Sequence, residues 1–89
     1  ERDDDFEIFQ SNFDLIHQDF FKLLDERFPG LTRNDKILCA YLNMNMSTKE
    51  IAPLLNISVR GVEVNRYRLR KKMNLDRDVN LSEFLSDLK

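Results

Sequence analysis

Residues 47–75 read STKEIAPLLNISVRGVEVNRYRLRKKMNL and carry the clearest structural signal in the chain. The stretch opens with Ser47-x-x-Glu50, the spacing at which a hydroxyl and a carboxylate cap the first turn of a helix reciprocally. A short apolar segment follows and ends at the polar break Asn56-Ile57-Ser58. Ser58 is a suitable N-cap for a longer helix over Val59–Met73. The pattern therefore predicts two helices joined by a tight turn.

Before this stretch, an apolar stripe with alternating spacings of three and four predicts one long helix that ends at Pro29-Gly30. Its members are Phe6, Phe9, Phe13, Ile16, Phe20 and Leu23. Such a stripe has to be buried, either against the rest of the chain or against a second copy, and the sequence leaves both possibilities open.

Further capping signals place the other helices. Thr32 is a predicted N-cap with Asp35 three residues on, and Asn45 is expected in the left-handed conformation after that helix. Asn80-x-x-Glu83 predicts the start of a last short helix. Its apolar residues are Leu81, Phe84, Leu85 and Leu88. Because no strand-like alternation competes, we predict an all-α fold with a connector or dimerisation helix over residues 1–30 and a four-helix unit over residues 31–89.

Length and composition exclude several classes of protein. The 89 residues suit a single domain with a small core. No apolar run approaches the ~20 residues of a membrane span, so we expect no membrane contact. The single Cys39 cannot form an internal disulfide, which fits a cytoplasmic protein and a small apolar filler in a core. His17 has no cysteine cluster nearby, so we predict no metal, cofactor or catalytic site.

Charge is distributed unevenly along the chain. The net charge is −2, but residues 1–31 sum to −6 and residues 32–89 to +4. Between Asn56 and Leu75 there are six basic residues and one acid, Glu63. Local positive charge attracts phosphate whatever the overall balance, so a helix-turn-helix with this surplus predicts a double-stranded DNA partner.

The two faces of the helix over Val59–Met73 indicate how it would bind. The core-facing residues are predicted to be Val59, Val62, Leu69 and Met73, and the preceding helix is expected to turn Ile51, Ala52, Leu54 and Leu55 inward. The opposite side carries the predicted base contacts Arg60, Glu63, Val64, Tyr67 and Lys71. The predicted phosphate contacts are Ser58, Arg66, Arg68, Arg70 and Lys72.

From Leu31 to about Asp78 the chain resembles the LuxR-type helix-turn-helix domain of bacterial transcription regulators. The motifs that carry the resemblance are Leu31-Thr32, Ser47, Lys49-Glu50-Ile51-Ala52, Leu55, Ile57-Ser58, Val62, Leu69, Lys72-Met73 and Leu75. The resemblance implies a four-helix unit that binds DNA, often as a dimer, to regulate transcription. Gly61 and Glu63 depart from the family pattern, which has threonine and often lysine there, so a different target sequence is expected.

The resemblance also implies an upstream sensor or receiver module, as in response regulators, and the absence of an initial methionine agrees with a piece of a longer chain. A homodimer could form through the Phe6–Leu23 stripe or through Leu81–Leu88. Two alternatives remain at this point. One is a promoter-binding region of the sigma-factor type, and the other is a helical module that binds protein.

Overall fold

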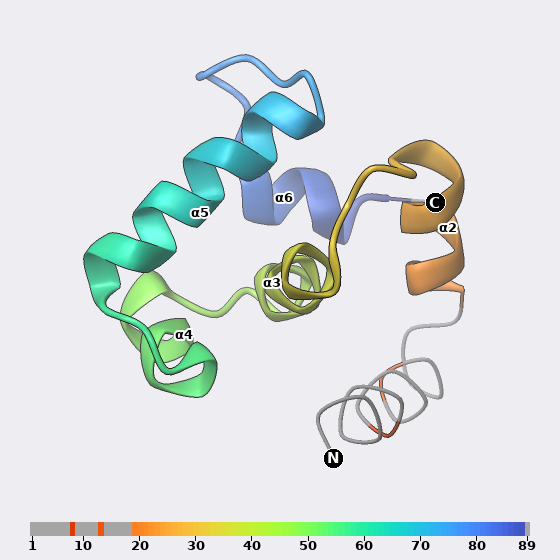
Figure 1. Cartoon of the computed structure of the whole chain (residues 1–89). Coiled ribbons are helices and arrows are strands. Elements are labelled where there is room, and N and C mark those ends of the chain that lie inside the picture. Colours follow the sequence, from red (N-terminus) through yellow and green to blue (C-terminus); the bar gives the residue numbers. More distant parts are fainter. Residues whose placement is uncertain (1–7, 9–12, 14–18, 89) are drawn as a thin grey trace.

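The computed structural model describes Ile8, Phe13 and residues 19–88, and every regular element within them is an α-helix (Figure 1). The order is α2 (Phe20–Arg27), α3 (Arg33–Asn43), α4 (Thr48–Leu55), α5 (Val59–Lys72) and α6 (Leu81–Ser86). Ile8 and Phe13 are also helical. The predicted all-α fold is confirmed for the described residues, and α4 and α5 are the two helices expected from residues 47–75.

Each of the helices α3 to α6 begins at the predicted cap. Thr32 accepts from the backbone N–H of Asp35 at 3.1 Å and Ser47 from that of Glu50 at 3.1 Å, and both carboxylates return a bond to the cap backbone. Ser58 begins α5, and Asn80 begins α6 by accepting from the N–H of Glu83 at 3.0 Å. Local hydrogen bonds within four residues thus define these helix starts.

Three consecutive helices end at an asparagine in the left-handed conformation. Asn45, Asn56 and Asn74 have φ of 61°, 58° and 57° after α3, α4 and α5. In each case the asparagine N–H bonds the carbonyl three residues back, and the next N–H bonds the carbonyl five residues back. This is the Schellman pattern, in which asparagine replaces glycine because its short polar side chain tolerates positive φ. The expectation for Asn45 is confirmed.

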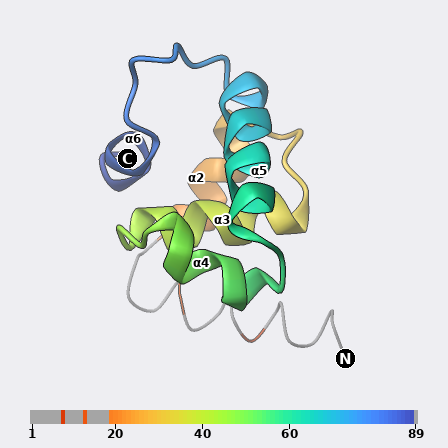
Figure 2. The ribbon, with the colours of Figure 1, turned by 90° about the vertical axis from the view of Figure 1, so that its left-hand side faces the viewer.

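The core lies between α3 and its neighbours. α3 packs against α6, and α4 packs against α5, which runs along the near face in Figure 2. The largest fully buried side chains are Phe21, Leu24, Leu38, Cys39, Leu42, Ile51, Val62, Leu69, Leu81 and Leu85. Cys39 is the predicted apolar filler, and burial, with a smaller contribution from the charge of Asp35, raises the pKa of its thiol to about 12. The thiol is therefore protonated at neutral pH.

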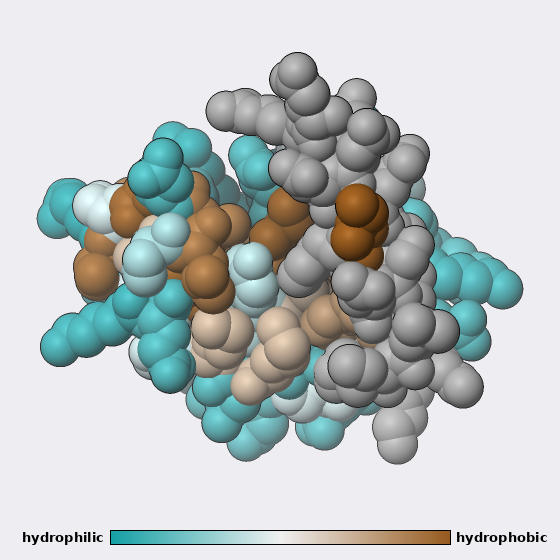
Figure 3. Space-filling model, turned by 90° about the horizontal axis from the view of Figure 1, so that it is seen from below, coloured by the Kyte–Doolittle hydropathy of each residue, from teal (hydrophilic) through white to brown (hydrophobic). Residues whose placement is uncertain are grey.

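Two residues that were expected in the core lie at the surface instead. Val59 is 40% exposed and Leu54 is 54% exposed, and Figure 3 shows apolar side chains on the side of α4 when the molecule is seen from below. At 100° per residue, Val59 lies about 60° outside the line of Val62, and Leu54 lies a similar angle outside the arc of Ile51 and Leu55. Both residues therefore lie at the edge of the buried side of their helices.

The N-terminal stripe differs from a single continuous helix in the part that the structure describes. Asp19 has φ 63°, so α2 begins after it at Phe20. Aspartate is among the few residues that adopt this conformation readily, which permits the break. Phe13 packs against Phe20 and Phe21 with ring centroids 5.3 and 5.4 Å apart. The stripe residues Phe6, Phe9 and Ile16, like His17, lie outside the described residues.

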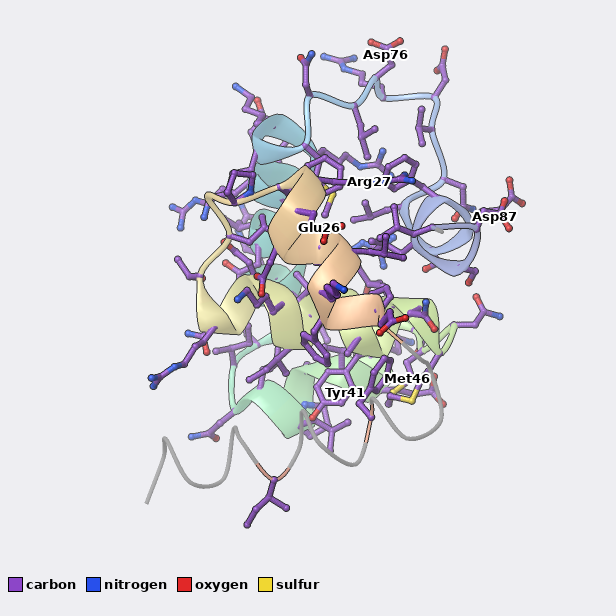
Figure 4. The ribbon with its side chains drawn as sticks, turned by 90° about the vertical axis from the view of Figure 1, so that its right-hand side faces the viewer. Glu26, Arg27, Tyr41, Met46, Asp76 and Asp87 are labelled. Carbon is purple, nitrogen blue, oxygen red and sulfur yellow. The ribbon has the colours of Figure 1, made fainter. Side chains whose placement is uncertain are left out.

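α2 and the residue that follows it contact α3 and α6. The Lys36 Nζ lies 2.6 Å from the Asp25 carboxylate, and the rings of Phe28 and Phe84 are 6.2 Å apart (α2 in front of α3 in Figure 4). Leu24 is fully buried in the same core as α3 and α6. Within the described part of the chain, no helix combines the length and apolarity that a membrane span requires.

Candidate nucleic-acid interface

The inner face of α5 is anchored in the core and its outer face is turned to solvent. Val62 and Leu69 are fully buried, and Met73 directly after the helix is 4% exposed. The predicted base-contacting residues are all exposed on the opposite side, and they are Arg60, Glu63, Val64, Tyr67 and Lys71. The sidedness predicted from the 3.6-residue period is confirmed except at Val59, and contact with bases stays a prediction.

Tyr67 and Lys71 form a pair at the centre of this outer face. They are one helical turn apart, and the Lys71 ammonium lies 4.8 Å from the centroid of the Tyr67 ring. A hydrogen bond from Lys71, followed by its charge, lowers the pKa of the Tyr67 hydroxyl, and the same contact raises the pKa of Lys71. The two side chains therefore present donors side by side, and a partner on this face meets them together.

The start of α5 is fixed by Ser58 and Gly61. The Gly61 N–H donates to the Ser58 hydroxyl at 2.9 Å, so the oxygen expected to meet a phosphate already accepts one hydrogen bond as the cap. A Cβ added at Gly61 would lie 3.3 Å from that oxygen and 3.4 Å from the Ile57 side chain. The glycine thus allows the turn between α4 and α5 to lie close against the first turn of α5.

Arg66 links α5 to the start of α4. Its guanidinium is half-buried and donates to the Thr48 hydroxyl at 3.3 Å. Burial and then the nearby charge of Arg70 lower the pKa of Arg66, while Glu63 opposes this shift. A guanidinium has five N–H donors, so this contact leaves others for a ligand.

Arg70 holds the loop between α5 and α6. Its Nη1 donates to the carbonyl of Asp76 at 3.3 Å and also to the carbonyl of Val79. The Val79 N–H in turn donates to the Asp76 carbonyl at 3.2 Å, which closes a turn over residues 76–79. Arg70 therefore has a structural function inside the domain in addition to any contact with DNA.

Lys72 links α5 to α3. Its ammonium lies 2.5 Å from the carboxylate of Asp35, the same group that caps α3 through the Thr32 N–H. Burial raises the pKa of Asp35, but the bonds from Lys72 and Thr32 and the Lys72 charge outweigh it, so the pKa is lowered overall. Of the five predicted phosphate contacts, Arg68 alone is exposed without a partner among the described residues.

Residues 30–85 match the family described as bacterial regulatory proteins, luxR family, and they make up more than half of the 89 residues. The chain belongs to the LuxR family. The match covers α3, α4, α5 and α6 up to its penultimate residue. No curated protein and no solved structure matched in the corresponding comparisons. A helix-turn-helix domain of the LuxR family binds DNA in the regulation of transcription, so DNA is the partner of this domain.

The sequence did not point to one basic residue that lies beside α5 in this LuxR-family domain. Arg77 lies in the loop after α5, and together with residues of α5 it lines a shallow hollow on the flank of that helix. In the sequence it stands between Asp76 and Asp78, so the three residues together carry a net negative charge. Only the folded loop brings Arg77 back beside α5, ten positions along the chain from Tyr67.

Proposed function

We propose that this LuxR-family domain binds double-stranded DNA sequence-specifically, with α5 in the major groove and α4 braced across the sugar-phosphate backbone. The observation that carries the proposal is the outer face of α5. None of its five side chains is buried in the core, and this face lies opposite the buried Val62 and Leu69. The major groove is wide enough to admit an α-helix, and a helix anchored on one side can place its exposed side against the base edges.

The chemistry of that face suggests which base edges it reads. Arg60 and Lys71 donate, which suits the O6 and N7 acceptors of guanine, and Glu63 accepts, which suits the amino group of cytosine. Val64 is 39% exposed and Tyr67 is 58% exposed, and both offer apolar contact to a thymine methyl group. Since Tyr67 and Lys71 form a pair, we expect their base preferences to depend on each other.

The flanks of α5 supply the proposed phosphate contacts, and these differ in how they are held. Arg68 extends from the surface. Arg66 and Lys72 keep one internal bond each and Arg70 keeps two, while their remaining donors stay available. Ser58 marks the start of α5 beside the backbone. Each phosphate neutralised adds ~0.9 to the slope of log affinity against log salt, so we expect a steep salt dependence.

Selection of bound sequences from a random duplex pool tests the proposal. We expect Glu63→Ala and Tyr67→Ala to change the preferred bases at separate positions, because they remove base contacts. Arg68→Ala is the matched control, since loss of a phosphate contact weakens all sequences alike. Lys72→Ala is less suitable as that control because it also removes the bridge to Asp35. Recovery of no preferred sequence by the unaltered domain would contradict the proposal.

The wider setting of the domain is part of the same hypothesis. A homodimer on a palindromic site, an upstream sensor or receiver module and a cytoplasmic location stay predictions. In both apolar stripes most of the described residues lie in the core of this chain: Phe13, Phe20, Leu81, Leu85 and Leu88 are buried there, and Leu23 and Phe84 are partly buried against it. A dimer would therefore form through other surfaces or through residues outside the described part, and half-site spacing in the selected sequences would report it.

A further inference from the structure

A shallow hollow of about 460 Å³ lies on the flank of α5, between this helix and the loop that leads to α6. Its lining consists of Glu63, Arg66, Tyr67, Arg70 and Arg77. Three guanidinium groups and one carboxylate thus surround it, which leaves it positively charged. The charge of Arg70 contributes to the lowered pKa of Arg66, so these cations are close enough to repel each other. An anion in the hollow would relieve that repulsion.

The loop presents Arg77 in a defined place. Arg70 donates to the carbonyls of Asp76 and Val79, the two residues that close the turn around Arg77. Arg77 itself has no hydrogen-bond or ion-pair partner in the described part of the chain. Its charge acts on the Tyr67 hydroxyl, which places it beside α5.

The acidic neighbours of Arg77 are directed elsewhere. Asp76 and Asp78 are exposed, and neither lines the hollow. Figure 4 shows Asp76 at the outer tip of the loop, pointing away from the helices. The turn therefore separates one basic side chain from two acidic ones, although they are consecutive in the sequence.

We propose that Arg77 binds a DNA phosphate beside the recognition helix and that Arg70 positions it by holding the loop. The inference rests on the proposed function, because the hollow shares Glu63 and Tyr67 with the face that reads bases. A strand whose bases meet those two side chains passes its backbone along this flank. The planar guanidinium of Arg77 can bond two phosphate oxygens at once.

Salt titrations of DNA binding test the contact. We expect Arg77→Ala to lower the log–log salt slope by about 0.9 and to weaken the selected duplex and an unrelated duplex by the same factor. Arg77→Lys keeps the charge and should retain most of the slope. The control is Lys22→Ala, which removes one positive charge from the exposed surface of α2, on the opposite side of the molecule from α5 (Figure 1). An unchanged slope for Arg77→Ala would overturn the inference.

A double-mutant cycle tests the positioning by Arg70. Arg70→Ala removes its own proposed phosphate contact and, if Arg70 positions Arg77, that of Arg77 as well. The slope should then fall about twice as much as in Arg77→Ala, and the double variant should fall no further than Arg70→Ala alone. A further fall in the double variant would show that Arg77 binds without help from Arg70, and would contradict the positioning role. Trypsin cleavage after Arg77 is a separate readout, because release of the loop in Arg70→Ala should accelerate it. Unchanged cleavage would contradict the positioning role.

The experiments give different results if this inference is wrong and if the proposed function is wrong. If the unaltered domain selects a sequence and Glu63→Ala alters it, but Arg77→Ala leaves the slope unchanged, the inference alone is wrong. If the unaltered domain selects no sequence, the proposed function is wrong as well.

Discussion

The outer face and the flanks of α5 carry similar basic side chains with different surroundings. Arg60 and Arg68 are exposed and have no hydrogen-bond or ion-pair partner among the described residues. Arg66, Arg70 and Lys72 instead donate to α4, to the loop before α6 and to α3. The comparison teaches that a basic helix is not one uniform DNA-binding surface. Some of its cations hold the domain together while others are free for the ligand.

The largest expected effect contrasts the inner and outer faces of the helix. Leu69→Ala should lower the free energy of unfolding by about 2–5 kcal/mol, because it leaves a cavity in a fully buried position. Val64→Ala should change it by less than about 0.5 kcal/mol while altering base preference. Urea unfolding followed by circular dichroism measures both. Equal losses from the two variants would contradict the assignment of the faces.

The next effect contrasts two arginines that are two residues apart. Arg70→Ala should cost about 1–3 kcal/mol of unfolding free energy, because the partly buried bond to the Val79 carbonyl and the exposed bond to the Asp76 carbonyl both lose their charged donor. Arg68→Ala is expected to be close to neutral, within about 0.5 kcal/mol, as for an unpartnered surface residue. Thermal unfolding of both variants measures the difference. A neutral Arg70→Ala would show that the loop does not depend on this side chain.

A smaller effect is expected where the outer face begins. Ser58→Ala should cost about 1 kcal/mol, because the Gly61 N–H loses its acceptor at the helix start. Ser58→Asn keeps a capping oxygen and should restore most of that stability. Chemical unfolding separates the capping role from any phosphate contact, since the latter appears only when DNA is present. Equal stability of the alanine and asparagine variants would contradict the cap.

The smallest effect concerns the bridge between Lys72 and Asp35. Because the Lys72 side chain is 41% exposed, Lys72→Met should cost no more than about 1 kcal/mol at neutral pH. The lowered pKa of Asp35 means that its contribution is present above its unfolded-state pKa near 3.8 and is lost as the pH falls through the folded-state value.

Acid unfolding checks the sign of this effect. Asp35→Asn and Lys72→Met should both weaken the loss of stability below about pH 4, relative to the unaltered domain, since each removes the bonded carboxylate–ammonium pair. Arg60→Met removes a charge from the outer face and serves as the control with an unchanged acid limb. A Lys72→Met variant that follows the unaltered curve would show that the bridge contributes little.

Features set by short-range interactions could be predicted from the sequence. The caps at Thr32, Ser47, Ser58 and Asn80 depend on residues three positions apart, and the left-handed Asn45 depends on its own side chain. The two faces of α5 follow from helical periodicity. These features could be predicted because each depends only on residues that are close to one another in the chain.

Features set by distant neighbours could not be predicted. The partner of Lys72 is 37 residues away in sequence and that of Arg66 is 18 away, so periodicity locates these cations on a face but not beside a partner. Val59 and Leu54 are apolar residues at helix edges, where exposure depends on whether another element covers them. The break at Asp19 and the return of Arg77 to α5 likewise depend on tertiary packing.

The internal bonds of α5 have a consequence for how the helix is rotated about its own axis. Arg66 and Arg70 hold one side of the buried line of Val62 and Leu69, and Lys72 holds the other. If the helix rotated about its axis by the angle of one residue, every side chain would move by 100° and a different set of side chains would face the groove. Bonds on both sides oppose rotation in either direction. They would thereby keep the same residues, Glu63 and Tyr67 among them, directed outward.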